Sequence, residues 1–396
     1  MEISTNPSNP DNFNVAYTHR LIEKVFQDYL DFFSVLGLMG PRQAGKSSLL
    51  QNILPHYQYI TFDDAVVRQR FYDDPKAFMT LYQNKVIFDE AQKVPEIFDW
   101  IKLAVDEDRN QAGKFVLCGS SQFLMMKSIT ESLAGRIGLI SLLPFQYQEI
   151  PEDLRKTAIY AGSYPELVNK KFKMKDAWYA AYIDTYLTRD VRDFGQVSQI
   201  RSFQQLMSLL AANTSQQLNY STYANDLGVD VKTIKSWVSI LEASFIIYLL
   251  PPYFSNLGKR LVKSPKIYFY DTGLVSFLTG IETEAQYDKG PMAGSIFENY
   301  LIMEMIKRER SLNTQAQFYY LRTSDGLEVD FMIDRKTYRE WIEIKKSHTF
   351  TEKMMANIKF FLQEGDVGFL LYSGETLDYS APCAVLNYED YLKNKP

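Results

Sequence analysis

Residues Gly40 to Ser47 read GPRQAGKS, so that two glycines enclose four residues, and a lysine and a serine follow the second glycine. The run before them, FFSVLGLM, is apolar and suits a buried strand, and the run after them, SLLQNIL, suits a helix. Glycines in such a loop let backbone N–H groups turn toward phosphate oxygens, and the positive end of the following helix favours the anion. This strand–loop–helix context favours a phosphate-binding P-loop over a surface Gly-rich turn.

The P-loop motif gives a role to each of its side chains. Lys46 is expected to reach the β- and γ-phosphates of a nucleotide, and the Ser47 hydroxyl is expected to ligate Mg²⁺. The chain is therefore expected to bind ATP or GTP, and we take ATP with Mg²⁺ as the predicted cofactors. The predicted cofactor-binding residues are Gly40, Pro41, Arg42, Gln43, Ala44, Gly45, Lys46, Ser47 and Ser48.

The strand KVIFDE ends in Asp89 and Glu90 and is typical of a Walker B element. Asp89 is expected to hold Mg²⁺ directly or through water, and Glu90 to polarise the attacking water as a general base. The alternative is an acidic turn after a strand. The P-loop upstream favours the nucleotide role.

Two further residues are candidates for the hydrolytic step. Ser120 follows the apolar strand FVLC, at the edge of a parallel sheet where ligands bind, and is a candidate partner of the γ-phosphate or the lytic water. The alternative is a plain Gly-Ser turn. Arg136 directly precedes the next strand, and we expect its guanidinium at this edge as an arginine finger, in cis or on a neighbouring subunit, with a solvated arginine as the alternative. The candidate catalytic residues are Lys46, Glu90, Ser120 and Arg136.

The last part of the chain carries an ordered set of charged residues. Glu298 lies on a predicted helix, Asp330 in LEVDFMID, and Glu343 and Lys345 in the strand EWIEIKKS. Because alternate residues of a strand point to the same face, Glu343 and Lys345 are expected side by side, within reach of Asp330. Asp330 and Glu343 are predicted ligands of a divalent cation, Lys345 would orient or help deprotonate water for phosphodiester attack, and Glu298 would add a further contact. Alternating surface charges are the alternative.

Between these regions the pattern changes to helix, turn, helix and hairpin, the order of a winged helix. Lys232, Thr233 and Lys235 begin its second helix, where a recognition helix would meet DNA bases. Further basic residues are expected on the wing near phosphates: Lys259, Arg260, Lys263 and Lys266. The alternative is a domain that only packs against its neighbours, which the net charge of -5 favours.

Composition excludes several classes of protein. The two cysteines, Cys118 and Cys383, offer no disulfide framework, and the three scattered histidines have no zinc-binding spacing. No apolar run is long enough to span a bilayer, and the first residues are polar. We therefore expect a cytoplasmic protein with no membrane partner.

Four stretches, GPRQAGKSSLL, VIFDEAQKVPEIF, CGSSQFLM and SLAGRIGLISLLPFQYQEI, together resemble a family of bacterial and archaeal AAA-type P-loop ATPases. The C-terminal half of those proteins has no assigned function. In this chain the stretches that resemble it are YLTRDVRDFG, GSIFENYLIMEMI and YYLRTSDGLEVDFMID. The resemblance covers nearly the whole chain. It implies that the last domain is similar to the restriction-endonuclease fold, with the PD-(D/E)xK pattern on Asp330, Glu343 and Lys345. The proline of that pattern is absent, because Glu328 and Val329 precede Asp330.

Strands that alternate with helices predict an α/β fold, a parallel sheet with helices on both faces, for the first part of the chain. The predicted parts are a flexible tail (1–18), the P-loop ATPase core (19–150), a helical lid or linker (151–200), a winged helix (201–284) and the small α/β nuclease-like domain (285–396). The expected function is an AAA-type ATPase whose nucleotide state gates contacts of the C-terminal half with DNA or a protein partner. The alternatives are an ATP-controlled metal-dependent DNA endonuclease and an ATP-switched protein-interaction module with an inactive nuclease fold. Because AAA-type relatives form rings, a homo-oligomer of this chain stays an open alternative.

Overall fold

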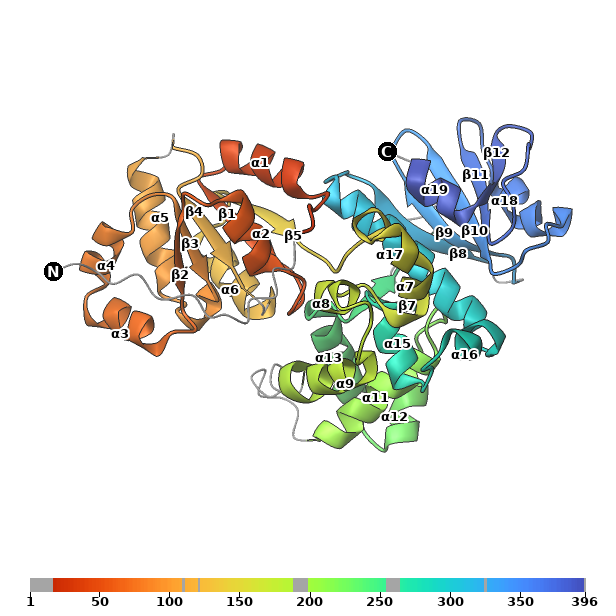
Figure 1. The fold of residues 1–396 in the computed structure, drawn as a ribbon, viewed down its shortest axis with the longest axis horizontal. Coiled ribbons are helices and arrows are strands. Elements are labelled where there is room, and N and C mark those ends of the chain that lie inside the picture. Colours follow the sequence, from red (N-terminus) through yellow and green to blue (C-terminus); the bar gives the residue numbers. More distant parts are fainter. Residues whose placement is uncertain are drawn as a thin grey trace.

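The structure is a computed structural model that describes residues 17–108, 111–119, 122–187, 199–253, 264–323 and 326–394. The predicted N-terminal tail therefore lies, up to residue 16, outside the described residues. A first sheet with its helices lies at one end of the molecule, and a second sheet lies at the other (Figure 1). A mainly helical region occupies the space below and between them (Figure 1).

The first sheet has five strands in the order β2-β3-β4-β1-β5, and all of its neighbours are parallel. The strands are β1 (Val35–Met39), β2 (Gln58–Thr61), β3 (Val86–Asp89), β4 (Phe115–Cys118) and β5 (Ile137–Ser141). The strands predicted at FFSVLGLM, KVIFDE and FVLC and after Arg136 correspond to β1, β3, β4 and β5. The predicted parallel sheet is confirmed.

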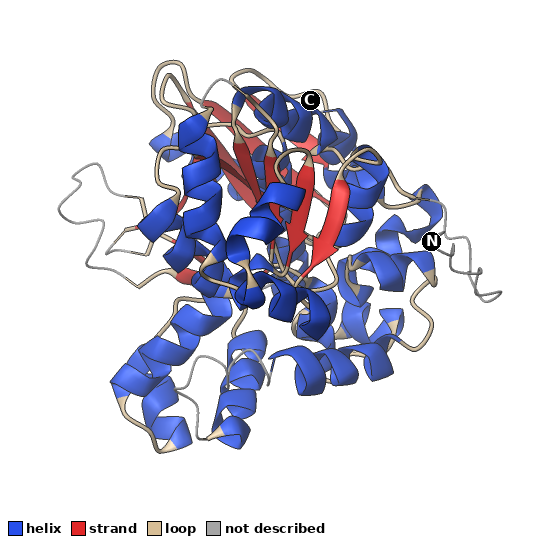
Figure 2. Cartoon of the chain, turned by 90° about the vertical axis from the view of Figure 1, so that its left-hand side faces the viewer, coloured by secondary structure: helices blue, strands red, loops and turns tan. Residues whose placement is uncertain are grey.

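Helices cover both faces of this sheet (Figures 1 and 2). Alternation along β1 explains how, because Leu36 and Leu38 pack on one face and Val35 and Met39 on the other. The first face is covered by α1 (Glu23–Phe32) and α2 (Lys46–Ile53). The second face is covered by α3 (Ala65–Asp73), α4 (Pro75–Leu81), α5 (Ile97–Glu107) and α6 (Gln122–Ser132).

The middle region consists of helices and one antiparallel pair of strands. Its helices are α7 (Arg155–Ala161), α8 (Pro165–Asn169), α9 (Lys175–Tyr182), a π-helical turn (Ile183–Leu187), α11 (Ile200–Ala212), α12 (Tyr220–Leu227), α13 (Val231–Ala243), α15 (Thr272–Leu278) and α16 (Glu284–Lys289). Between α13 and α15, β6 (Ile247–Leu250) and β7 (Lys266–Phe269) form an antiparallel pair. The described residues thus follow the predicted order of helix, turn, helix and hairpin.

The helix α17 (Ala293–Ser311) connects this region with the second sheet and is buried around most of its circumference. It contacts α7, α15, β7, β10 and α19. A helix that is apolar or buried on all sides belongs to a core rather than to a surface. The long helix therefore joins the middle region and the C-terminal region into one packed unit.

The second sheet has the order β12-β11-β10-β9-β8. Its strands are β8 (Gln317–Arg322), β9 (Glu328–Asp334), β10 (Arg339–Lys345), β11 (Val367–Tyr372) and β12 (Cys383–Asn387). The first three are antiparallel neighbours, and β10, β11 and β12 are parallel. The helices α18 (Ala356–Phe361) and α19 (Tyr388–Asn394) complete this region. In the part of the chain that the structure describes, no helix has the length and apolar character needed to cross a bilayer.

Candidate nucleotide site and carboxylate cluster

The loop between β1 and α2 has the backbone shape that its glycines permit. Gly40 has a φ of 144°, and a Cβ there would lie 2.0 Å from the carbonyl oxygen of Leu142. Gly45 has a φ of 92° and immediately precedes α2. Side chains at these positions would meet a clash or strained backbone. The loop therefore depends on both glycines to curl over the end of the helix.

Lys46 is the first residue of α2, and its side chain reaches back to the loop and leaves the residue 7% exposed. Its Nζ donates hydrogen bonds to the carbonyl oxygens of Gly40 and Pro41, both at 2.8 Å. Burial lowers the pKa of Lys46, while Cys118 and Glu90 act to raise it. Among the described residues no carboxylate lies within ion-pair distance of Nζ. The ammonium group is thus buried in a position where an anion would be its natural partner.

Ser47, Tyr59 and Asp89 meet beside the loop. The Tyr59 hydroxyl donates to Asp89 Oδ2 at 2.6 Å and also interacts with Ser47. Burial, and then the hydrogen bond to Asp89, raise the pKa of Tyr59, so the phenol keeps its proton. A serine hydroxyl and a carboxylate offer the oxygen ligands that Mg²⁺ prefers, so the residues fit the predicted ion.

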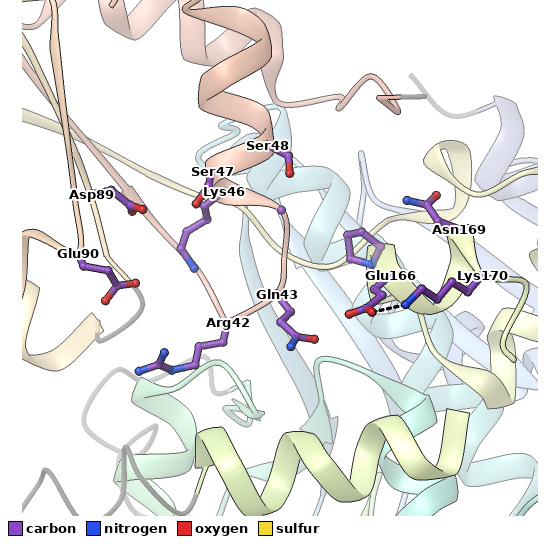
Figure 3. A pocket seen from close by; sticks show the side chains of 12 residues that line it. Arg42, Gln43, Lys46, Ser47, Ser48, Asp89, Glu90, Glu166, Asn169 and Lys170 are labelled. Atoms are coloured by element: carbon purple, nitrogen blue, oxygen red, sulfur yellow. Dashed lines mark hydrogen bonds and ion pairs between the residues drawn. The ribbon is translucent and has the colours of Figure 1, made fainter. Parts of the chain in front are cut away.

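Glu90 follows β3 in a left-handed conformation, with a φ of 54°. Its Oε2 accepts a hydrogen bond of 2.5 Å from Gln92 Nε2. Left-handed backbone at a non-glycine residue costs free energy and is often retained at functional sites. The turn places Glu90 beside Asp89 at the rim of the pocket (Figure 3).

The pocket over the P-loop has a volume of about 520 Å³ and is lined from two parts of the chain. Asp89 and Glu90 lie on one side of Lys46, and Glu166, Asn169 and Lys170 lie beyond the loop on the other side (Figure 3). The last three belong to α8 and the residue after it, and Lys170 pairs with Glu166 at 2.6 Å. A ligand on the P-loop would therefore lie next to the middle region as well.

A buried arginine connects the P-loop to the chain that leaves the first sheet. Arg20 donates to the carbonyl oxygens of Ala44 at 3.0 Å and Leu143 at 2.7 Å. Its Nε lies 3.0 Å from Glu149 Oε2, and both side chains are almost fully buried. Glu149 also accepts from the backbone N–H of Leu21 at 2.8 Å. One side chain thus holds the P-loop and the segment 143–149 in a fixed relation.

The segment 143–149 is in turn held by α17. Lys307 Nζ donates to the carbonyl oxygen of Phe145 at 3.1 Å and pairs with Glu304 at 2.9 Å. Glu304 accepts from the backbone N–H of Tyr147. A continuous set of polar contacts therefore runs from the P-loop to the long helix.

Two predicted catalytic residues remain, Ser120 and Arg136, and the structure describes only the second. Ser120 lies outside the described residues. Arg136 pairs with Asp106 through two hydrogen bonds, at 2.9 Å and 3.1 Å. Because Ile137 pairs with Val35 and Ser141 with Met39, Arg136 stands at the opposite end of the sheet from the P-loop. The expected position of Arg136 at the ligand edge is wrong, since the residue before a parallel strand lies at its amino end.

The predicted C-terminal residues do come together. Lys345 Nζ lies 2.6 Å from Glu343 Oε1 and 3.4 Å from Asp330 Oδ2. Asp330 Oδ2 also accepts from the backbone N–H of Ile344 at 2.9 Å. Glu298 is close enough to raise the pKa of Glu343. We call Glu298, Asp330, Glu343 and Lys345 the carboxylate cluster.

Asp330 and Glu343 are buried, and like charges crowd around them. Burial, followed by repulsion from Asp330, raises the pKa of Glu343 to about 8. Burial also raises the pKa of Glu298 to about 7. Glu343 Oε2 is buried without a hydrogen-bond partner, which suits a further cation. However, no three acidic, histidine or cysteine side chains of the described residues gather closely enough to hold a metal ion. Asp330 and Glu343 therefore fit a divalent cation as a pair only.

The predicted DNA-contact residues fall into three groups. Lys232 and Lys235 are exposed in the first turns of α13. Lys259, Arg260 and Lys263 lie outside the described residues. Lys266, expected on an exposed wing, is buried with 3% of its surface exposed and pairs with Glu328 at 2.6 Å, so that placement is wrong.

Sequence reasoning missed residues of other elements that contact the P-loop and Asp89 or line the pocket. Tyr59 contacts Asp89 and Arg20 contacts Ala44, and neither was among the predicted site residues. The break SYPEL, with Pro165 at the first position of a helix, marks α8, but no local signal shows that α8 faces the P-loop.

The first third of the chain, residues 33–151, matches the family model described as an AAA domain. Residues 151–285 and 293–390 match two families described as domains of unknown function, DUF8612 and DUF4143. These two matches assign no activity to the middle and C-terminal regions.

Relatives extend the similarity over most of the chain. An uncharacterized protein of Mycobacterium tuberculosis is 28% identical over 317 residues, which cover 80% of this chain and 71% of that protein. An uncharacterized protein of Haemophilus influenzae is 23% identical over 356 residues, covering 80% and 82%. A solved Walker-type ATPase of Pyrococcus abyssi is similar with a TM-score of 0.47 and 15% identity, over 65% of this chain and 94% of that one. The AAA domain match and the P-loop geometry support a P-loop ATPase family for the first third of this chain.

Proposed function

We propose that the protein binds ATP with Mg²⁺ on the P-loop and hydrolyses it. The observation that carries this proposal is the buried ammonium group of Lys46, which faces the loop's own carbonyl oxygens inside a pocket that also contains Asp89 and Glu90. Lys46 would hold the β- and γ-phosphates, Ser47 and Asp89 would hold Mg²⁺, and Glu90 would take a proton from the attacking water. Mg²⁺ would neutralise charge on the phosphates.

Nucleotide state would gate the C-terminal half through two routes. The first is direct, because Glu166, Asn169 and Lys170 line the same pocket as the P-loop. The second runs from Ala44 through Arg20 to the segment 143–149, and from there to α17. A shift of the P-loop on binding phosphate would therefore be transmitted to α17, the helix that carries Glu298 of the carboxylate cluster.

The partner of the C-terminal half is proposed to be DNA or a protein. Lys232 and Lys235, exposed at the start of α13, support DNA, since a recognition helix meets the duplex at this end. The burial of Lys266 removes one cation from that surface and, with the net charge of -5, supports a protein partner.

A second candidate function is metal-dependent cleavage of a phosphodiester at the carboxylate cluster. The observation that favours it is the buried, unpartnered Glu343 Oε2 beside Asp330 and Lys345. A divalent cation there would polarise a phosphate oxygen or a water. Plasmid cleavage with Mn²⁺, by the wild type and Asp330→Asn, tests it. Cleavage that survives Asp330→Asn, or none by the wild type, would remove this candidate.

The test of the ATPase proposal is hydrolysis of ATP and GTP by the full chain with and without Mg²⁺. We expect hydrolysis of ATP that needs Mg²⁺ and is lost in Asp89→Asn. The matched control is Asp73→Asn, at the end of α3, away from the residues that line the pocket. Hydrolysis at equal rates by the wild type and Asp89→Asn would contradict the proposal.

A further inference from the structure

Glu298 is held by β7 rather than by the other members of the carboxylate cluster. Its Oε1 accepts a hydrogen bond of 2.7 Å from the Tyr268 hydroxyl and lies 3.3 Å from Lys266 Nζ. Both partners belong to β7, whose neighbouring strand is β6. The third carboxylate expected at the site is thus engaged by another element.

Backbone pairing and side-chain contacts with several elements hold Lys266 in this position. The strand register pairs it with Leu250, and an isolated bridge pairs it with Gln217. Its Nζ also lies 2.6 Å from Glu328 Oε1 and over the ring of Tyr320, 5.5 Å from the centroid. With 3% of its surface exposed, the lysine has almost no access to water. It therefore acts as a built-in counter-ion between β7, α17 and β9.

With Glu298 engaged by β7, only Asp330 and Glu343 remain as carboxylate ligands of the predicted cation site. Asp330 and Glu343 share Lys345, yet Glu343 Oε2 stays buried and unpartnered. No three candidate ligands among the described side chains gather around a common point. Glu328 and Asp330 are alternate residues of β9 and point to the same face. A cation bound to Asp330 would therefore lie on the face where Lys266 contacts Glu328.

We propose that Lys266 withholds Glu298 from Asp330 and Glu343 and thereby sets the affinity of this site for a divalent cation. The inference rests on the candidate metal site of the second function above. Since Lys266 belongs to the β6–β7 hairpin and not to the second sheet, displacement of the hairpin would remove a positive charge and free a carboxylate in one step. The hairpin is thus a positioning element for the site.

The experiment measures Mn²⁺ binding by electron paramagnetic resonance, with the full chain, without nucleotide and in an Asp89→Asn background that disables the P-loop site. Lys266→Met keeps the length of the side chain and removes its charge. A charge within about 4–6 Å changes the affinity of a carboxylate for a proton by about 10-fold or more, so we expect Mn²⁺ to bind at least about 10-fold more tightly. Lys353→Met, at an exposed lysine, is the matched control.

Two further variants complete the design. Adding Glu298→Gln to Lys266→Met should reverse the gain, and adding Asp330→Asn should abolish binding. If Lys266→Met does not fold, Lys266→Gln replaces it, because an amide can still hydrogen-bond to Glu298 without a charge.

The outcomes separate this inference from the function on which it rests. Asp330-dependent binding that is equally tight in the wild type and in Lys266→Met would overturn the role of Lys266 and leave the metal site standing. If neither the wild type nor the variants bind Mn²⁺, the metal site fails, and the inference fails with it.

Discussion

Lys46 and Lys266 are both buried lysines, 7% and 3% exposed, but their surroundings are opposite. Lys46 donates to backbone carbonyl oxygens in the P-loop, and burial lowers its pKa. Lys266 lies between Glu298 and Glu328, and these carboxylates and Asp330 raise its pKa above the ordinary value despite burial. The ammonium group is hydrogen-bonded to backbone carbonyl oxygens in one region and ion-paired with carboxylates in the other.

This difference separates a site that is ready for an anion from one that is internally balanced. A buried charge that is not ion-paired is costly, so the ammonium group of Lys46 would gain free energy by pairing with a phosphate. At the carboxylate cluster the protein supplies its own cations, and a ligand must compete with them. The comparison predicts that the P-loop responds strongly to its ligand and that the cluster binds a cation only in competition with the protein's own lysines.

The largest expected effect is on stability without ligand. Lys266→Met should lower the free energy of unfolding by about 3–5 kcal/mol, because breaking a buried ion pair leaves carboxylates uncompensated. Lys46→Met should change it by about 1 kcal/mol or less, since two hydrogen bonds are lost but a buried charge is removed as well. Urea unfolding of both variants without nucleotide provides the measurement. Equal losses in the two variants would break the comparison.

The next effect concerns turnover at the P-loop. Glu90→Gln should lower kcat for ATP by about 10²–10⁴-fold, the usual contribution of a general base, while leaving ATP binding intact. Steady-state hydrolysis with a parallel binding titration measures both quantities. Glu107→Gln, at the exposed end of α5, serves as the control. Unchanged turnover in Glu90→Gln would remove Glu90 from the mechanism.

The smallest effect is expected from the pocket wall that α8 supplies. Lys170 lines the pocket and would place a positive charge beside the bound ATP. Lys170→Ala should weaken ATP binding by only about 1 kcal/mol, roughly fivefold, because this charge is partly exposed and screened by water. Lys173→Ala, an exposed neighbour that does not line the pocket, should leave the affinity unchanged. Identical affinities in the two variants would show that Lys170 does not contribute to binding of the nucleotide.

The sequence predicted what is local and missed what depends on chain direction or distance. The P-loop and the pair Asp89–Glu90 are contiguous, so their placement at strand ends could be predicted. The proximity of Glu343 and Lys345 followed from strand alternation. Arg136 was expected at the wrong end of the sheet, because it precedes its strand rather than follows it.

Lys266 shows a different limit of sequence reasoning. It follows a basic loop, and such a run is usually solvated, but its neighbours in space come from α17 and β9, which lie far along the chain. The same holds for Tyr59 and Arg20, whose contacts to Asp89 and Ala44 depend on tertiary packing. No local pattern carries that information.

The most direct test of the central claim is calorimetric titration of MgATP into the wild type, Lys46→Ala and the control Lys24→Ala, an exposed residue of α1. Hydrogen bonds to charged groups contribute about 1.5–3 kcal/mol each, so loss of the ammonium group should weaken binding by about 100-fold or more. The account predicts one bound ATP per chain for the wild type and Lys24→Ala, and no measurable binding for Lys46→Ala at the same concentrations. Wild-type affinity in Lys46→Ala would contradict the claim that this buried lysine is the phosphate site.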